Sequence, residues 1–228
     1  RDVERSRGLG DVYKRQYQIS ISITILFIMI VPLLSNSFVD FFWGFGVLTL
    51  GILHGANDLE IIAKNFKGEL NNLYFNSILI YLVLVITGAV LFFILPDIAL
   101  PLFILFSSYH FGEQHWEERL SFSLFHFIFY TLYGGFIFFL MFTLQYEPVV
   151  EVIKKISGYH LGFDFFLYAT VFLGLTLFIA MLLMPTTRSF FIKEWLLHLL
   201  LGLIYNEGSL LYAFAYNFVV WHRLPSLI

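Results

Sequence analysis

Long apolar stretches fill the sequence between residues 17 and 222, and they limit the possible folds more than any other feature. Hydrophobic residues make up 59% of the chain and charged residues only 13%, whereas soluble domains carry about 25% charged residues. So few charges cannot cover a water-soluble globule. We therefore expect a multi-span membrane protein. A soluble enzyme, a disordered chain, a coiled coil and a nucleic-acid binder are excluded.

Eight apolar stretches come close to the length of about 20 residues that a helix needs to cross a bilayer. The sequence predicts an all-α fold, a multi-span transmembrane bundle of about eight helices in one domain. The short stretches 98–111, 190–205 and 209–222 are expected inside the bundle. The predicted spans are Tyr17–Leu34, Phe38–His54, Leu73–Leu95, Ile98–Phe111, Leu120–Leu144, Leu161–Met184, Phe190–Tyr205 and Ser209–His222.

The two ends of the chain differ from the part between them. Residues 1–16 hold eight charges and almost no large apolar side chain. They resemble a translated adaptor tail, so we expect a non-native or disordered segment; a native polar tail is the alternative. Residues 17–222 form the predicted transmembrane catalytic domain. Residues 223–228 end the chain abruptly, and we expect them to be a non-native end.

Basic residues orient the predicted bundle, because cytoplasmic loops are rich in Lys and Arg. With the N-terminus inside, only Lys154 and Lys155 fall outside. Six basic residues fall inside: Lys64, Lys67, Arg119, Arg188, Lys193 and Arg223. The expected location is the inner (plasma) membrane, in a multi-pass arrangement.

Three histidines then share one depth. His54, His110 and His222 each end an inward-running span, and His198 lies about one turn into a span that starts on the same side. Ionisable residues within spans are usually functional, and imidazole suits Fe, Zn, Cu or Ni. The alternative for each is a hydrogen bond to a nearby carbonyl. Three histidines without this pattern are expected to be structural or interfacial: His115, His126 and His160.

Acidic residues follow two of these histidines. Asp58 comes four residues after His54, and Glu113 comes three after His110. A carboxylate one helical turn away can accept the second ring N–H of a metal-bound histidine and fix its tautomer. We therefore predict that Asp58 orients His54. Solvation of these acids at the membrane edge is the alternative.

Three sequence blocks carry a family resemblance. Leu53–Asp58 (LHGAND), Tyr109–Glu113 (YHFGE) and Phe218–His222 (FVVWH) resemble, in order, the signature blocks of the Brp/Blh family. That family consists of integral-membrane β-carotene 15,15′-dioxygenases. The resemblance implies an Fe(2+) enzyme that inserts both atoms of O2 across the central double bond of β-carotene and releases two retinal molecules. It also implies a lipid bilayer environment, a metal site near the cytoplasmic side, and possible transfer of retinal to a microbial rhodopsin.

The resemblance implies four iron ligands, of which His54, His110 and His222 match three. The fourth follows the third in a His-x3-His pattern, and Ser226 stands at that position. We expect this departure to reflect truncation at the C-terminus, with His198 as a less favoured substitute. Aromatic residues near the blocks are expected to form a tunnel for the polyene: Phe103, Phe106, Tyr109, Phe111, Phe214, Tyr216, Phe218 and Trp221.

The sequence also bears on other membrane functions. A multi-span transporter or scaffold without catalysis is the main alternative; a transporter would favour two related halves with broken helices, and none are visible. A retinal-binding rhodopsin needs a lysine in mid-span, and the basic residues lie near span ends. The sequence also has no Cys, which excludes Cys-ligated metals and thiol catalysis.

Overall fold

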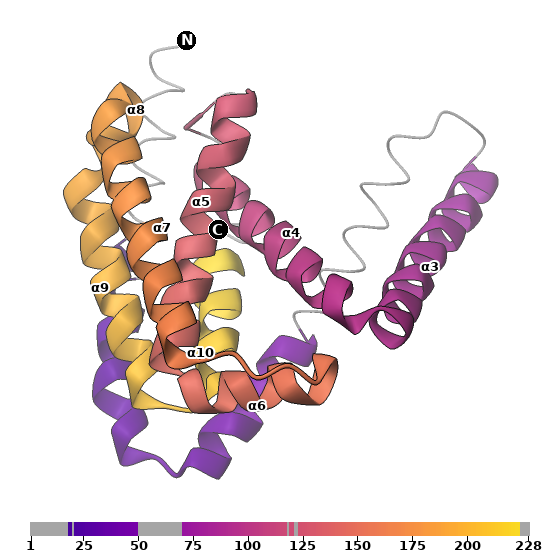
Figure 1. Ribbon diagram of the computed structural model, residues 1–228, viewed down its shortest axis with the longest axis horizontal. Helices are drawn as coiled ribbons and strands as arrows, with labels where there is room; N and C mark the ends of the chain where they lie inside the picture. Colours follow the sequence, from indigo (N-terminus) through magenta and orange to yellow (C-terminus); the bar gives the residue numbers. More distant parts are fainter. Residues whose placement is uncertain (1–17, 20, 50–69, 118, 121–122, 224–228) are drawn as a thin grey trace.

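All regular structure in the described chain is helical. The computed structural model describes residues 18–19, 21–49, 70–117, 119–120 and 123–223, and these ranges contain helices and no strand (Figure 1). The all-α prediction is confirmed for this part of the protein.

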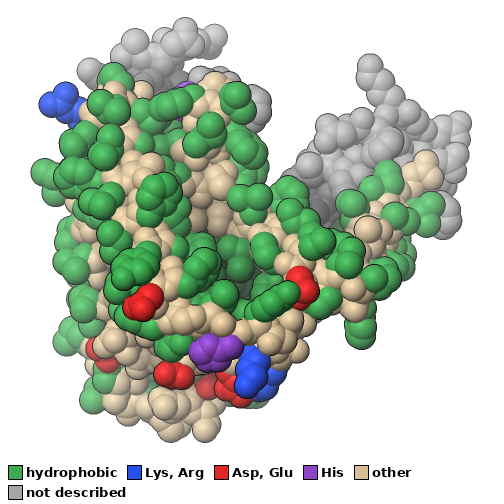
Figure 2. Space-filling view, viewed as in Figure 1, with side chains coloured by type: hydrophobic (Ala, Val, Ile, Leu, Met, Phe, Trp, Pro, Cys, Tyr) green, Lys and Arg blue, Asp and Glu red, His purple; other side chains and the backbone are tan. Residues whose placement is uncertain are grey.

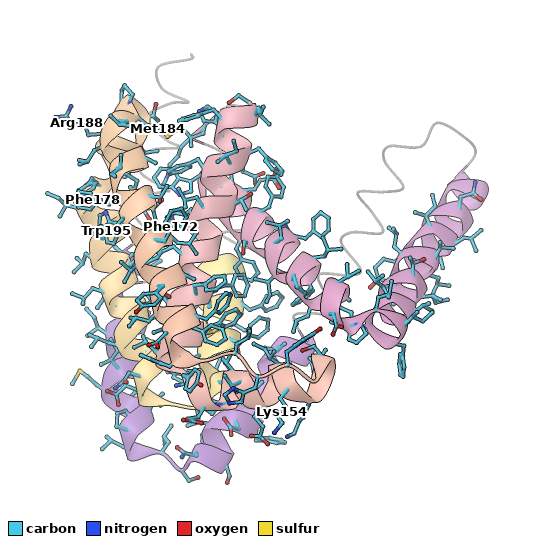
Figure 3. All side chains as sticks on the ribbon, in the orientation of Figure 1. Lys154, Phe172, Phe178, Met184, Arg188 and Trp195 are labelled. Carbon is cyan, nitrogen blue, oxygen red and sulfur yellow. The ribbon has the colours of Figure 1, made fainter. Side chains whose placement is uncertain are left out.

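Three helices form the centre of the molecule (Figure 1). These are α5 (Leu124–Leu144), α7 (Phe163–Leu183) and α9 (Phe191–Glu207). Ser123 starts α5 by accepting a hydrogen bond from the backbone N–H of His126 at 3.2 Å, a standard N-cap. Phe178 of α7 and Trp195 of α9 pack with ring centroids 5.7 Å apart (Figure 3).

Two further helices extend from this centre. Helix α4 (Pro96–Trp116) crosses α5, and α3 (Leu70–Ile94) continues outward from the start of α4 (Figure 1). Pro96 and Asp97 suit the first turn of α4, because this turn has spare N–H groups and a positive dipole end. Helix α4 is longer than the predicted 98–111 span. Its polar last turns stay helical because they have partners in neighbouring helices: His115 bonds to Glu194 of α9, and Trp116 packs against Tyr133 of α5.

The first described residues pack against the last ones. Residues 21–30 and 36–49 are helical and flank η1 (Val31–Leu33). Trp43 contacts Tyr212 and Tyr216, with ring centroids 5.6 and 5.4 Å apart. The hydroxyl of Tyr216 also lies 2.8 Å from that of Thr24. Segments far apart in the sequence therefore close one side of the bundle.

The sequence did not predict α6 (Tyr146–Ser157), which runs across one end of the bundle (Figure 1). It buries Val149, Val150 and Ile153 and exposes the salt bridge of Lys155 to Glu151. Gly158 ends it with φ +76°, a left-handed conformation that glycine adopts readily. Such a helix is too short and too charged to register as a span.

The last predicted span is divided in two. Helix α10 (Leu210–Tyr216) continues into η2 (Asn217–Arg223), which is a π-helix. Elsewhere, α8 (Pro185–Arg188) forms a single turn between α7 and α9. π-Helical turns are rare and occur frequently at functional sites. This one coincides with the Phe218–His222 block.

Within the described ranges, two helices, α5 and α7, are long and apolar enough to cross a membrane. A bundle of about eight spans stays a prediction. Apolar side chains cover much of the surface (Figure 2), including most of α3 and the outer side of α7. Lys154 and Arg188, assigned to opposite sides by the charge pattern, lie at opposite ends of the bundle (Figure 3).

Candidate functional site

The Tyr109–Glu113 block lies where α4 crosses α5, and two glycines make the crossing close. A Cβ atom on Gly112 would lie 1.9 Å from the carbonyl oxygen of Tyr130, and one on Gly134 would lie 2.0 Å from that of Ser108. Both distances are far below van der Waals contact, so only glycine fits at either position. The backbone of α4 around His110 is thus held directly against α5.

His110 lies on an exposed face of α4, six residues before the helix ends. Helix α4 therefore continues past His110, and the position of His110 at the end of a membrane span stays a prediction. Its ring contacts that of Phe111, with centroids 6.3 Å apart. Glu113 accepts a hydrogen bond from the hydroxyl of Tyr109, so this acid is more than a solvated residue at the membrane edge.

Phe111 joins the second sequence block to the third. Its ring lies 6.5 Å from that of Phe218 in η2 and 5.3 Å from that of Phe138 in α5. The π-helix that contains His222 is therefore next to the part of α4 that contains His110. Residues of the second and third sequence blocks are therefore in contact.

The remaining predicted site residues lie outside the described parts of the chain. His54 and Asp58 belong to residues 50–69, and Ser226 belongs to residues 224–228. His222 is placed in η2, but its side chain is not among those described. Within the described residues, no three His, Asp or Glu side chains are close enough to hold a metal ion. The iron ligands therefore remain a prediction.

Sequence reasoning missed a buried charged cluster beside α4. Glu194 of α9 is 1% exposed, and its carboxylate accepts three hydrogen bonds. These come from His115 Nε2 at 3.0 Å, Arg119 Nη1 at 3.2 Å and the Tyr133 hydroxyl at 2.7 Å. The guanidinium of Arg119 also lies over the rings of Trp116 and Phe190.

This cluster joins α4, α5 and α9 around one carboxylate. His115, predicted to be structural or interfacial, has a structural role here. A signal in the sequence could have revealed the cluster: an acid inside an apolar helix needs a partner, and His115 and Arg119 are spaced one turn apart. The sequence alone could not identify His115 and Arg119 as the partners of Glu194, because they lie 79 and 75 residues away from it.

His198 lies two turns into α9, rather than one, and is 3% exposed. The rings of Tyr133, Phe136 and Trp195 surround it at centroid distances of 5.1, 5.0 and 5.5 Å. Neither ring nitrogen has a hydrogen-bond partner within the described part of the chain. Its substitution for the fourth ligand stays a prediction, since the other ligands are not all described.

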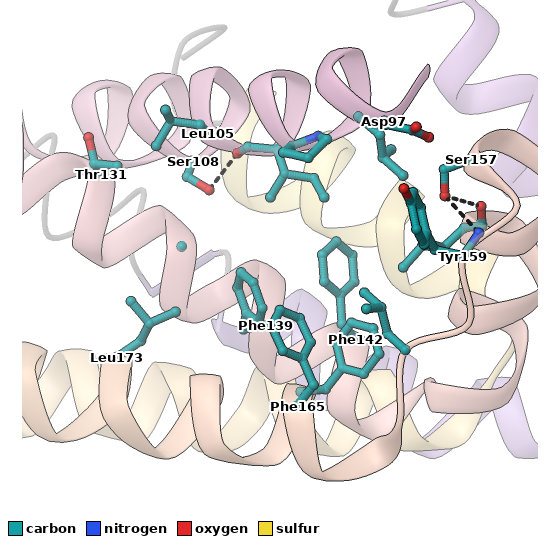
Figure 4. Close-up of a pocket in the computed structure, with 17 residues that line it drawn as sticks. Asp97, Leu105, Ser108, Thr131, Phe139, Phe142, Ser157, Tyr159, Phe165 and Leu173 are labelled. Atoms are coloured by element: carbon teal, nitrogen blue, oxygen red, sulfur yellow. Dashed lines mark hydrogen bonds between the residues drawn. The ribbon is translucent and has the colours of Figure 1, made fainter. Parts of the chain in front are cut away.

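A cavity of about 420 Å³ lies between α4, α5, α6 and α7 (Figure 4). This volume is within the range of about 300–1,000 Å³ typical of small-molecule sites. Of the eight aromatic residues predicted to form a tunnel, the seven whose side chains are described do not line it. Its aromatic lining instead comes from α5, α7 and the segment after α6: Phe139, Phe142, Phe165, Phe166 and Tyr159.

Comparison with known protein families gives a match over most of the chain. The family model described as beta-carotene 15,15'-dioxygenase matches residues 45–228. No curated protein and no solved structure matches the chain. The matched range contains all three sequence blocks and most of the described helices.

Proposed function

The chain belongs to the beta-carotene 15,15'-dioxygenase family, and from this premise we propose that it cleaves β-carotene at the central double bond with O2 to give two retinal molecules. The single observation that carries this proposal is the family match, which spans the residues from His54 to His222. The contact of Phe111 with Phe218 supports it, because it brings two of the three family blocks together.

The proposed cofactor is Fe(2+), held by His54, His110 and His222. Neutral imidazoles are suitable ligands for iron, and two of the proposed donors belong to neighbouring helices, His110 to α4 and His222 to η2. Bound iron would supply the activation of O2 next to the polyene.

The protein's own residues then have three tasks. Asp58 is proposed to accept the free ring N–H of His54 and so fix its orientation. Gly112 and Gly134 hold α4, and with it His110, directly against α5. Phe111 and Phe218 pack together beside the histidines and keep that side of the proposed site apolar, as a hydrocarbon substrate requires.

The proposed setting is the inner (plasma) membrane. β-Carotene dissolves in the hydrocarbon core of a bilayer, and the exposed apolar side chains of α3 and α7 suit the same environment. Under the predicted orientation the iron lies near the cytoplasmic side. The retinal product would be available to a microbial rhodopsin in the same membrane.

Bacterial cells that accumulate β-carotene provide the test. Production of the chain, and of a Ser226→His version that completes the family pattern, is expected to reduce the orange colour and yield retinal in cell extracts. Retention of all β-carotene by both cultures, with the protein present in the membrane fraction, would contradict the proposal.

A further inference from the structure

The cavity beside α4 has the shape of a groove. Helices α4 and α5 touch at Gly112 and Gly134 and diverge toward α6, while α7 forms the opposite wall (Figures 1 and 4). Ile153 and Ser157 of α6, with Tyr159 and Leu161 after it, close the far end. Figure 2 shows this face of the molecule hollowed between α4 and the bundle.

The groove is long and narrow. Its floor on α5 runs from Thr131 to Phe142, and its wall on α4 runs from Asp97 to Ser108. At a rise of about 1.5 Å per residue, each of these stretches is roughly 16 Å long. A volume of about 420 Å³ spread over such a length fits an extended, rod-like ligand rather than a compact one.

The lining offers a ligand almost no free hydrogen-bond donor. The hydroxyl of Ser108 donates to the carbonyl of Ile104 at 2.6 Å, and that of Thr131 donates to the carbonyl of Phe127 at 3.0 Å. The remaining polar lining residues, Asp97, Ser157 and Tyr159, are confined to the α6 end. Between the ends the groove therefore suits a hydrocarbon.

The groove and His110 lie on different faces of α4. Ser108 lines the groove, and two residues of an α-helix turn by about 200°, which places His110 on the opposite side. A ligand held along the groove therefore has its reacting bond elsewhere. The groove can hold only a part of the substrate that is remote from the bond to be cleaved.

We propose that this groove binds one arm of the carotenoid substrate, with its end ring beneath α6 and its central double bond outside the groove. The choice of occupant rests on the proposed function. The fit rests on the length, narrowness and apolar lining of the groove. The groove thus selects for an extended polyene with an apolar end, independently of the metal.

Filling the groove tests this inference. Gly135 lies on its floor, and a Cβ there would meet Leu173 and Ser108 at ordinary contact distances of 3.8 Å. Gly135→Leu therefore projects into the open space. Thr131→Leu fills the same end from the preceding turn. Gly88→Leu is the matched control, because a Cβ on Gly88 meets nothing within 4 Å.

The measurement is β-carotene bound per protein, read by absorbance after purification of iron-free protein that remains monodisperse. We expect Gly135→Leu and Thr131→Leu to bind β-carotene about tenfold more weakly or worse, the scale of a misplaced methylene in an apolar pocket. Gly88→Leu should bind it normally. Normal binding by both filled variants would overturn the inference.

A parallel assay separates this inference from the proposed function. If the iron-loaded chain binds β-carotene through the groove but never forms retinal, the proposed reaction fails and the groove assignment stands. If retinal forms and the filled variants keep the KM of the unaltered chain, the reaction stands and the groove assignment fails.

Discussion

Phe111 of α4 and Phe218 of η2 pack ring against ring, with centroids 6.5 Å apart. They join two segments more than a hundred residues apart, and each segment contains a histidine proposed to bind iron. His110 directly precedes Phe111, and His222 follows Phe218 by four residues. The predictions below follow from this contact and from the packing around it.

The first prediction concerns His110. Replacement by Ala removes one proposed imidazole donor, so bound iron and retinal formation should both be lost. Iron content of the purified protein is the measurement. His160→Ala is the control, because His160 is exposed in the segment before α7. Equal iron content in the two variants would show that His110 is not a ligand.

The second prediction concerns Asp58. Asp58→Asn keeps the size of the side chain and removes its charge, so His54 should be oriented less well. Iron affinity is expected to fall roughly 10–100-fold, the usual effect of losing a hydrogen-bond partner of a metal ligand. Unchanged iron affinity, measured by titration with Fe(2+), would return Asp58 to the role of a solvated surface acid.

The third prediction concerns Ser226. A hydroxyl is a poor ligand for Fe(2+), so Ser226→His should increase iron affinity by completing the His-x3-His pattern with His222. Competition with a metal chelator measures the change. If the variant and the unaltered chain lose iron equally readily, position 226 does not contribute a ligand.

The fourth prediction concerns Glu194. Glu194→Ala leaves Arg119 and His115 beside an empty, buried space. Removal of one partner of a buried ion pair costs about 3–5 kcal/mol, so the melting temperature in detergent should fall strongly. Glu151→Ala is the matched control: its salt bridge with Lys155 is exposed, and such pairs contribute little. Similar melting temperatures for both variants would rule out the buried network as a major source of stability.

The fifth prediction concerns Gly112. Gly112→Ala places a methyl group 1.9 Å from the carbonyl oxygen of Tyr130, so α4 must move away from α5. Overpacking of this kind costs about 1–3 kcal/mol or more, and His110 should move with the helix. Gly88→Ala should instead stabilise α3 by up to about 1 kcal/mol through helix propensity. Thermal unfolding of both variants is the measurement, and a Gly112→Ala protein as stable as the unaltered chain would contradict the close crossing.

The sequence was sufficient for features that depend on local chemistry. Apolar runs predicted the helices that became α5 and α7, as the predicted spans Leu120–Leu144 and Leu161–Met184. The short amphipathic α6 escaped prediction, because its charges hide its apolar face from any search for spans. The length of α4 was underestimated, since its polar residues are buried by partners that only the fold supplies.

Long-range features could not be predicted either, because they too depend on contacts that only the fold supplies. Glu194 could be recognised as a costly buried acid, but not as the partner of His115 and Arg119. The groove arises from the angle at which α4 leaves α5, and that angle is set by the contact at Gly112 and Gly134. Gly112 can be read from the sequence, but which helix packs against it is decided by tertiary packing.

Retinal formed per β-carotene consumed tests the central claim most directly. The purified Ser226→His chain is stripped of metal, given β-carotene in air, and assayed before and after addition of Fe(2+). The account predicts no reaction without iron, two retinal molecules for each β-carotene with iron, and no retinal from the His110→Ala version under either condition. Retinal formation without iron, cleavage products other than retinal, or full activity in the His110→Ala version would contradict it.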